Sequence, residues 1–206
     1  MFKGKIVAVT GAAGGIGQSL CRHFAGQGAH IAAIDKSPAL EGFMKEAWSK
    51  DIRSSHAIID VGDRNAVKDA FNQLSSALGP VDILVNNAGF SSHPTFVRTD
   101  PESWQHEVNG NLNSAYYCAH AVLDGMKAKG GGSIVAIGSV NGLGALGDPA
   151  YSAAKAGLIS LTKSLAVEYG RFNIRSNIVL PGTVRTPLWE LRAAKNPAVL
   201  ETLRKG

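Results

Sequence analysis

Short apolar runs alternate with longer amphipathic segments along most of this chain, and this alternation restricts the fold more than any other feature. The runs are rich in Val, Ile and Ala and are apolar on both faces, which is typical of strands in a parallel sheet covered by helices. We predict six such strands, at 6–10, 29–34, 56–59, 81–85, 133–137 and 174–179. The clearest helical segments between them cover 15–27, 64–78, 112–129 and 151–169.

Strands that alternate with helices at this spacing are joined by crossover connections and lie parallel. The sequence therefore predicts an α/β protein with a Rossmann-type, doubly wound parallel sheet in three layers. A length of 206 residues leaves room for one domain, which we place over 1–206. Sheets of this kind bind ligands beyond the carboxyl ends of their strands, so motifs at those ends are examined first.

Composition and charge exclude several classes of partner. The hydrophobic fraction of 45% predicts a folded core rather than a disordered chain. The net charge is +5, but Lys and Arg are scattered, and Arg204-Lys205 is their only adjacent pair, so we expect no nucleic-acid partner. No apolar run reaches the roughly 18 residues of a membrane span, and no signal peptide is visible. We therefore expect a soluble, cytoplasmic protein without a membrane partner.

The cysteine and histidine pattern indicates no metal site. Cys21 and Cys118 are far apart in the sequence and lie in segments predicted to be helical, where buried reduced thiols are the ordinary case. No group of His, Cys and carboxylate residues has metal-ligand spacing, so we expect no catalytic metal.

A glycine-rich segment, TGAAGGIG at 10–17, follows the first predicted strand and leads into a predicted helix. Gly11 allows a tight turn out of the strand, and Gly17 allows the helix to pack closely on the sheet. Gly15 lets backbone N–H groups approach a pyrophosphate at the helix N-terminus, where the helix dipole favours an anion. The segment predicts a dinucleotide-binding site.

Asp35 ends the second predicted strand, about 20 residues after the glycine segment, the spacing at which dinucleotide-binding sheets carry an acidic residue. A carboxylate there accepts hydrogen bonds from the ribose of NAD and repels the 2′-phosphate of NADP. Lys36 is adjacent and could bind that phosphate, although the glycine segment itself holds no Arg or Lys. We predict NAD as the cofactor, with NADP as the less favoured alternative.

Three further motifs follow in order: NNAG at 86–89 after the fourth predicted strand, YSAAK at 151–155, and PGTVRT at 181–186 after the sixth. Together with the glycine segment, they resemble the classical short-chain dehydrogenase/reductase family over essentially the whole chain. The resemblance implies an NAD(P)-dependent oxidoreductase that interconverts a secondary alcohol and a ketone or aldehyde by hydride transfer. It also implies a small-molecule alcohol or carbonyl substrate.

Tyr151 and Lys155 are four residues apart on a predicted helix and therefore share one face. A free tyrosine has a pKa near 10, too high for a base at neutral pH. We expect the Lys155 cation, together with the positive nicotinamide ring of an oxidised cofactor, to lower the pKa of Tyr151. The resemblance implies that Tyr151 exchanges the hydroxyl proton of the substrate and that Lys155 also holds the nicotinamide ribose.

The resemblance adds Ser139 and Asn111 to the catalytic set. Ser139 follows the fifth predicted strand, and its hydroxyl can orient the substrate oxygen and stabilise charge there. Its spacing to Tyr151 is one residue shorter than is common in the family, a difference that the glycine-rich loop 143–149 could absorb. Asn111 is chosen among three neighbouring asparagines as the residue that holds a water near the lysine, with Asn109 second. Either asparagine could instead be a helix N-cap.

The resemblance also places residues around the cofactor. Asp60 and Val61 would contact the adenine edge, Asn87 and Gly89 would lie beneath the adenosine ribose and nicotinamide, and Thr186 would hold the carboxamide. The full predicted cofactor set is Gly11, Gly15, Ile16, Gly17, Asp35, Asp60, Val61, Asn87, Gly89, Tyr151, Lys155, Pro181, Gly182, Val184 and Thr186.

The chain departs from the family after residue 186. Family members continue with a substrate lid, a further helix and a last strand, whereas here only the start of the lid, about 187–206, has a counterpart. Either the natural product continues past Gly206, or this is a shortened member with one open sheet edge and without the usual last strand. We expect a homo-oligomer: a dimer through the helices at 112–129 and 151–169, and a tetramer if a longer product exists.

A second function stays open at this point. A site without its full lid could bind a dinucleotide without turning over a substrate, as a nucleotide-sensing protein would. The complete set of four catalytic residues favours the enzyme.

Overall fold

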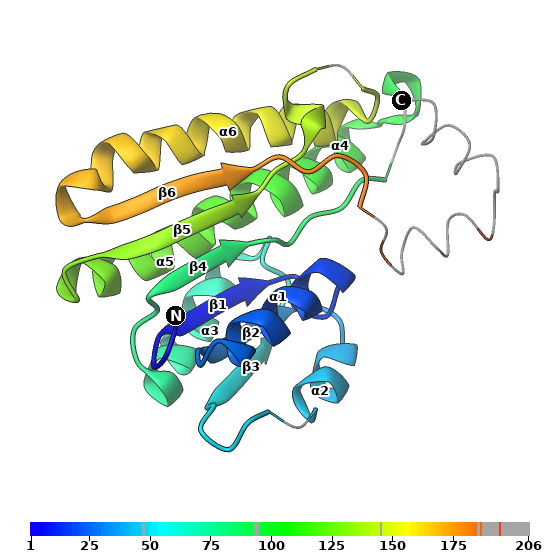
Figure 1. Ribbon diagram of the computed structural model, residues 1–206. Helices are drawn as coiled ribbons and strands as arrows, with labels where there is room; N and C mark the ends of the chain where they lie inside the picture. Colours follow the sequence, from blue (N-terminus) through cyan, green and yellow to red (C-terminus); the bar gives the residue numbers. More distant parts are fainter. Residues whose placement is uncertain (47, 93–94, 145, 185, 187–193, 195–206) are drawn as a thin grey trace.

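A single parallel sheet of six strands forms the centre of the molecule (Figure 1). The computed structural model describes residues 1–46, 48–92, 95–144, 146–184, 186 and 194. Its strand order is β3-β2-β1-β4-β5-β6, with every neighbouring pair parallel, so the predicted Rossmann-type fold is confirmed. The strands are β1 (Ile6–Thr10), β2 (His30–Asp35), β3 (Ser54–Ile58), β4 (Ile83–Asn86), β5 (Gly132–Ile137) and β6 (Ile174–Val179).

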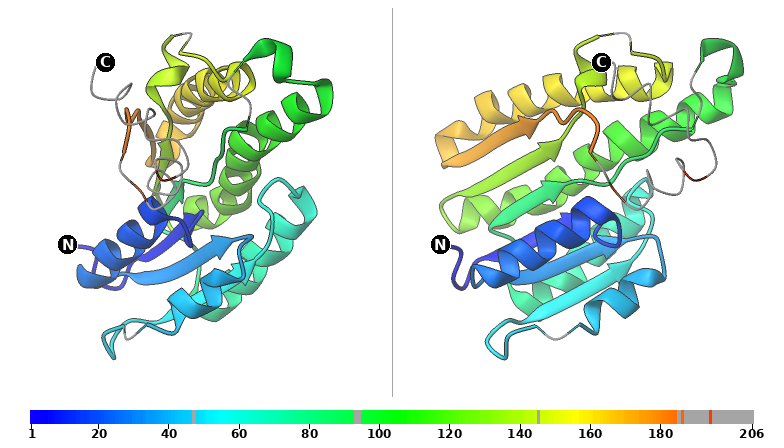
Figure 2. Two further views of the ribbon diagram at one scale, coloured as in Figure 1. Left: turned by 90° about the vertical axis from the view of Figure 1, so that its right-hand side faces the viewer. Right: turned by 45° about the vertical axis from the view of Figure 1, so that its right-hand side comes forward.

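Helices cover both faces of the sheet, which gives three layers (Figure 2). Helices α3 and α5 pack together, and α6 packs beside β6, while α1 and α2 cover the β1–β3 half of the opposite face. The helices are α1 (Gly15–Gly26), α2 (Ala39–Met44), α3 (Arg64–Leu78), α4 (Pro101–Val108), α5 (Ser114–Ala128) and α6 (Pro149–Tyr169). Short helical turns are η1 (Phe96–Arg98), η2 (Asn109–Asn113), η3 (Val140–Gly142) and η4 (Gly170–Phe172).

Alternate side chains of the buried strands serve two separate cores. Ile6 and Ala8 of β1 point toward α3 and α5, whereas Val7 and Val9 point toward α1 and α2. All five residues of β1 are buried, which explains why this strand reads as a continuous apolar run rather than an alternating one. The pairing of β1 with β2 and β4 sets its register and therefore the position of the glycine segment that follows it.

Strand β1 lies between β2 and β4, so the chain direction across the sheet reverses at the β1–β4 pair. This reversal separates the loops that follow β1 and β4 and leaves a crevice between them, the usual ligand position in such sheets. The sheet thus places the glycine segment and the NNAG segment on opposite sides of one opening.

The structure adds two helices that were not predicted. Helix α4 starts after Asp100, whose side chain accepts a hydrogen bond from Ser103 N at 2.7 Å, and Pro101 occupies its first turn. Both are ordinary signals of a helix start. Helix α2 has only six residues, too few to show a clear period. The predicted helix at 112–129 instead begins at Ser114, after a π-helical turn at η2.

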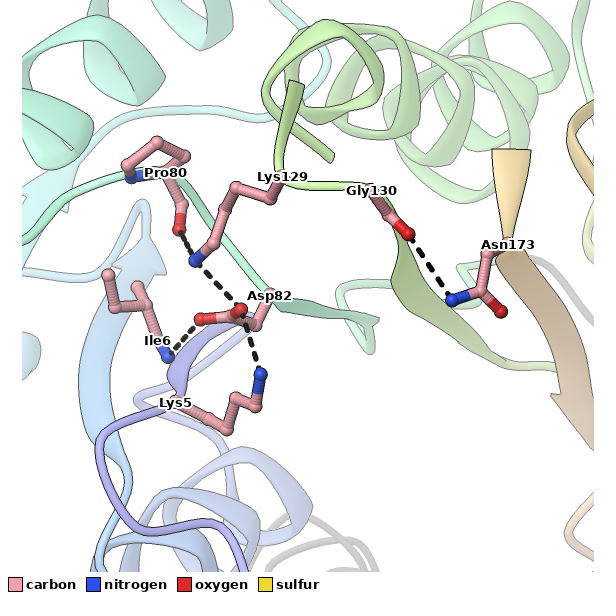
Figure 3. Close-up of polar contacts among 7 residues, drawn as sticks. All are labelled: Lys5, Ile6, Pro80, Asp82, Lys129, Gly130 and Asn173. Carbon is pink, nitrogen blue, oxygen red and sulfur yellow. Dashed lines mark hydrogen bonds and ion pairs between the residues drawn. The ribbon is translucent and has the colours of Figure 1, made fainter. Parts of the chain in front are cut away.

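At the amino-terminal edge of the sheet, Asp82 ties three elements together (Figure 3). Its carboxylate accepts a hydrogen bond from Ile6 N at 2.9 Å, lies 2.7 Å from Lys129 Nζ at the end of α5, and lies 3.4 Å from Lys5 Nζ. Lys129 also donates to Pro80 O at 3.0 Å. Burial alone would raise the pKa of Asp82, but the Ile6 amide and the two lysines outweigh it and hold the pKa below its ordinary value.

The predicted start of the substrate lid at 187–206 falls outside the described residues except for Ala194. In the part of the chain that the structure describes, no helix combines the length and the apolar character needed to cross a bilayer. The same described residues contain no group of three or more His, Cys, Asp and Glu side chains placed to hold a metal ion.

Candidate active site

The loops that follow β1, β2, β3 and β4 surround a cavity of about 330 Å³ at the carboxyl edge of the sheet. Thr186, beyond β6, also lines this cavity. Most of the predicted cofactor residues line this cavity, whereas Pro181, Gly182, Val184, Tyr151 and Lys155 do not. The lining residues are Gly11, Gly14, Gly15, Ile16, Gly17, Asp35, Lys36, Ile59, Asp60, Val61, Asn87, Ala88, Gly89, Phe90, Gly110 and Thr186.

The glycine segment has the shape of a phosphate cradle. Gly11 has a φ of +66°, a left-handed conformation, and a Cβ there would lie only 2.9 Å from Asn87 Nδ2. A Cβ on Gly17 would collide with Gly11 O, so α1 can approach the loop only with glycine at this position. The N–H groups in the first turn of a helix have no intrahelical partner, and no side chain caps α1. The residues present therefore fit the pyrophosphate of a dinucleotide.

Thr10 connects this cradle to the NNAG segment, a role that the sequence analysis did not assign. Its hydroxyl oxygen accepts hydrogen bonds from Asn87 N and Ala88 N, both at 3.0 Å. In the other direction, Asn87 Nδ2 donates hydrogen bonds to Thr10 O at 2.9 Å and to Gly11 O at 3.2 Å. The two loops that face each other across the crevice are thus held by four hydrogen bonds.

Asp35 lies on the cavity wall, as predicted, and also organises the glycine segment. Its carboxylate oxygens accept hydrogen bonds from Ala13 N and Ser37 N, both at 2.9 Å. A carboxylate offers about four acceptor positions, so these two bonds leave room for hydroxyl donors from a ribose.

Lys36, the residue that could favour a 2′-phosphate, is engaged on the same wall. Its Nζ lies 3.7 Å from Asp60 Oδ2 and 5.2 Å from the centroid of the Phe90 ring. Asp60 also accepts a hydrogen bond from Gly62 N at 2.9 Å. The Asp60 carboxylate thus forms an ion pair with the Lys36 ammonium group.

Lys155 is buried in α6, with only 3% of its surface exposed. Its Nζ donates a hydrogen bond to Ile137 O at the end of β5, at 2.9 Å, and lies 5.4 Å from the centroid of the Tyr151 ring. Burial lowers the pKa of Lys155 from 10.5 to about 8. Its ammonium group is therefore poised to change charge close to neutral pH.

The direction of the Tyr151 pKa differs from the prediction. Burial of the phenol raises the pKa, a hydrogen bond from Ser139 lowers it, and the negative charge of Asp148 raises it further, so the net change is upward. The expected lowering by Lys155 is thus wrong for the protein chain by itself. Tyr151 is protonated at neutral pH in this structure.

The interval between Ser139 and Tyr151 contains η3 and the loop before α6. Gly147 and Asp148 both have positive φ, +86° and +48°, and Asp148 is the residue that precedes the first turn of α6. This turn leads into α6, where Tyr151 lies close enough to Ser139 for the serine hydroxyl to lower the pKa of the phenol. It also carries the Asp148 carboxylate toward Tyr151, which no local sequence signal predicted.

Asn111 lies in the π-helical turn η2 and is 1% exposed. Its Nδ2 donates to Phe90 O at 2.8 Å and to Glu107 O at 2.9 Å, and its Oδ1 accepts from Phe90 N at 3.2 Å. Asn109, the second candidate, instead donates to Gly62 O at 2.9 Å, in the loop after β3. Asn111 also lies beside Lys155, because a Cβ on Gly89 would be 2.6 Å from Asn111 Oδ1 and 3.2 Å from Lys155 Nζ, whereas Asn109 contacts the loop after β3.

The match to a family model decides the classification. The model of the short chain dehydrogenase family matches residues 5–197, nearly the whole chain. The chain belongs to this family. Family members bind NAD(P), and the protein is an oxidoreductase of the short-chain dehydrogenase/reductase type.

Relatives of known sequence agree with this classification. The chain is 42% identical over 205 residues to an uncharacterized oxidoreductase from Schizosaccharomyces pombe, covering 98% of this chain and 76% of that protein. It is also 37% identical over 194 residues to an acetoacetyl-CoA reductase from an Acinetobacter species, covering 91% of this chain and 77% of that protein.

Solved structures show the same fold. A short-chain dehydrogenase/reductase from Burkholderia thailandensis superposes with a TM-score of 0.88 at 44% identity, covering 98% of this chain and 77% of that chain. L-sorbose reductase from Gluconobacter frateurii, solved with NADPH and L-sorbose, gives a TM-score of 0.86 at 32% identity, covering 93% and 74%.

Proposed function

We propose that this short-chain dehydrogenase interconverts a secondary alcohol and a ketone or aldehyde, with Tyr151 as the acid/base group. One observation carries the proposal: Gly89 lines the dinucleotide cavity and at the same time adjoins the side chains of Asn111 and Lys155. The buried Lys155 side chain therefore lies directly beside the cavity that fits the cofactor.

A bound nicotinamide dinucleotide would supply the hydride acceptor or donor. Ser139 would hold the substrate oxygen, because its hydroxyl lies close enough to Tyr151 to lower the pKa of that phenol. Tyr151 would pass its proton to that oxygen during reduction and take it back during oxidation. Since Tyr151 is protonated at neutral pH, the protein alone is already in the form that reduction requires.

Lys155 would gain or lose a proton during the reaction. With a pKa of about 8, its ammonium group is close to the point at which it can release a proton. As a cation 5.4 Å from the Tyr151 ring centroid, it would favour the phenolate that forms when Tyr151 gives up its proton.

We further propose that the cofactor is NAD rather than NADP. Asp35 presents a carboxylate where the adenosine ribose would lie, and a carboxylate repels a 2′-phosphate. Lys36 is the cation that could attract such a phosphate, and its charge is already opposed by Asp60. The NADPH in the L-sorbose reductase structure belongs to that protein and does not decide the preference here.

A homodimer through α5 and α6 is the assembly that we propose. Both helices carry large apolar side chains that face solvent: Tyr116 on α5 is 49% exposed and Val167 on α6 is 86% exposed. Sedimentation of the wild-type protein and of a Val167→Lys variant tests this, and a wild-type monomer would contradict it.

Tyr151→Phe tests the enzymatic proposal. The variant should bind NADH as wild type does, because Tyr151 does not line the cavity. It should lose at least about a hundredfold in turnover of any alcohol that the wild type oxidises, as expected when a general acid/base group is removed. Full activity in Tyr151→Phe would refute the role of Tyr151. If the wild type binds NADH but turns over none of a broad panel of alcohols and ketones, the alternative of a dinucleotide-sensing protein is supported instead.

A further inference from the structure

Asn141 lies on η3, between Ser139 and the first turn of α6. It contacts Ser139 twice. Asn141 N donates to Ser139 Oγ at 3.2 Å, and Asn141 Oδ1 lies 3.3 Å from the same hydroxyl oxygen. On its other side, Asn141 Nδ2 lies 3.4 Å from Ser152 Oγ, beside Tyr151 on α6.

The direction of these hydrogen bonds follows from counting hydrogens. A serine hydroxyl has one hydrogen. Ser152 gives its hydrogen to Gly147 O, at 2.6 Å, so the Asn141 atom that faces Ser152 must be the donor, Nδ2. The carbonyl Oδ1 therefore faces Ser139, and Ser139 gives its hydrogen to Oδ1.

Ser139 then has no second hydrogen to offer. A substrate oxygen, or the phenolate of Tyr151, needs the same hydrogen that Asn141 Oδ1 accepts. Rotation of the Ser139 hydroxyl about its Cβ–Oγ bond moves this hydrogen from one acceptor to the other, and no covalent bond changes.

We propose that Asn141 is a positioning residue that holds the Ser139 hydroxyl hydrogen on its side-chain oxygen and yields it to the oxygen that binds beside Tyr151. Ser152 and Gly147 O fix the amide in the orientation that this requires. The proposal rests on the proposed function, because it assigns the released hydrogen to a substrate oxygen.

The pKa of Tyr151 reports on this competition without any turnover. Besides Ser139, the groups whose charge faces the Tyr151 ring are Asp148 and Lys155, and both stay unchanged in the variants below. The titration is followed by NMR of protein labelled with ¹³C at the tyrosine ζ carbon. The signal of Tyr151 is identified among the four tyrosines by its absence in Tyr151→Phe.

Two substitutions of Asn141 should move the Tyr151 pKa in opposite directions. Asn141→Leu has similar volume but no acceptor, which frees the Ser139 hydrogen for the phenolate and should lower the pKa by about one pH unit. Asn141→Asp provides a stronger acceptor and a negative charge, and should raise the pKa. The fall in Asn141→Leu is the decisive shift, because the added negative charge of Asn141→Asp by itself also raises the pKa.

Ser152→Ala provides an independent test that leaves Asn141 intact. Without Ser152, the amide can turn and present Nδ2 to Ser139, so the Tyr151 pKa should fall, as in Asn141→Leu. Ser164→Ala is the matched control, because it removes a serine hydrogen bond of 3.1 Å to Ser160 O on the exposed face of the same helix and should leave the pKa unchanged.

Opposite shifts in the two Asn141 variants, with a fall in Ser152→Ala, support the proposal. Shifts of the same sign, or no shift beyond that of Ser164→Ala, overturn it. If circular dichroism shows that an Asn141 variant does not fold, the result of Ser152→Ala decides by itself. Loss of the proposed enzymatic function would be recognised separately, through Tyr151→Phe, because the titration requires neither cofactor nor substrate.

Discussion

Asn111 and Lys155 meet beside Gly89, at the position where a side chain would stand. A Cβ added to Gly89 would lie 2.6 Å from Asn111 Oδ1 and 3.2 Å from Lys155 Nζ, so both side chains occupy space that any other residue would need. The absence of a side chain at the end of the NNAG segment therefore lets a residue of η2 and a residue of α6 converge beside the dinucleotide cavity.

Gly89→Ala should damage catalysis more than stability. The new methyl group would displace the Lys155 ammonium or the Asn111 amide, and a displacement of about 1 Å at a catalytic group can cost roughly a hundredfold in rate. We expect a comparable loss in kcat, measured with whichever alcohol the wild type oxidises. Gly144→Ala is the control, since a Cβ there meets nothing within 4 Å, and it should retain wild-type activity. Equal activity in the two variants would show that the contact at Gly89 has no catalytic importance.

Lys155 should reduce the stability of the protein at neutral pH. Its pKa falls from 10.5 to about 8 on folding, so below pH 8 the folded state carries a buried charge at a cost of about 3 kcal/mol. Between pH 8 and 10.5 the unfolded state binds more protons than the folded state, and this cost disappears as pH rises. Lys155→Met should therefore raise the free energy of unfolding by about 2 kcal/mol at pH 7, allowing about 1 kcal/mol for the lost bond to Ile137 O.

Urea unfolding at pH 7 and at pH 10.5 measures this effect. The difference between wild type and Lys155→Met should shrink toward zero or reverse at the higher pH. Lys163→Met, at an exposed position of the same helix, should show no such dependence. Parallel stability curves for wild type and Lys155→Met would contradict the lowered pKa.

Asp82→Asn should weaken the amino-terminal edge of the sheet. The substitution removes the charge that lies 2.7 Å from Lys129 Nζ and 3.4 Å from Lys5 Nζ, and we expect a loss of about 1–2 kcal/mol in the free energy of unfolding at pH 7. Because the pKa of Asp82 is lowered on folding, its contribution is present above the ordinary carboxyl pKa and is lost as pH falls through the lowered value. Wild type and variant should therefore converge in acid.

Asp124→Asn is the comparison for this edge. Asp124 is 94% exposed in its pair with Lys127, and exposed pairs contribute little. Its removal should change the free energy of unfolding by less than about 0.5 kcal/mol. If Asp82→Asn lowers the free energy of unfolding no more than Asp124→Asn does, Asp82 does not stabilise the fold.

The features predicted well from the sequence depend on local rules. The positions of Gly11 and Gly17 follow from a turn and from helix–sheet contact, and each shows in the structure the close approach that requires glycine. Tyr151 and Lys155 share a helix face because of the period of the helix. The parallel direction of the strands follows from the helical crossovers that join them.

The features that were missed depend on burial, on irregular backbone conformation or on contacts between distant segments. The upward shift of the Tyr151 pKa arises from burial and from Asp148, which a left-handed turn brings close. The role of Thr10 could not be predicted, because its two donors lie more than 70 residues away in the sequence. They reach Thr10 only through the pairing of β1 with β4. The π-helical turn around Asn111 likewise shows no periodic signal in the sequence.

The most direct test of the dinucleotide site is a fluorescence titration of this 206-residue chain with NADH and, separately, with NADPH. We predict tight binding of NADH and at least about tenfold weaker binding of NADPH, a difference of roughly 1.4 kcal/mol. Asp35→Ser should narrow that difference by removing the carboxylate. Tighter binding of NADPH would contradict the assignment of Asp35, and binding of neither nucleotide would contradict the site itself.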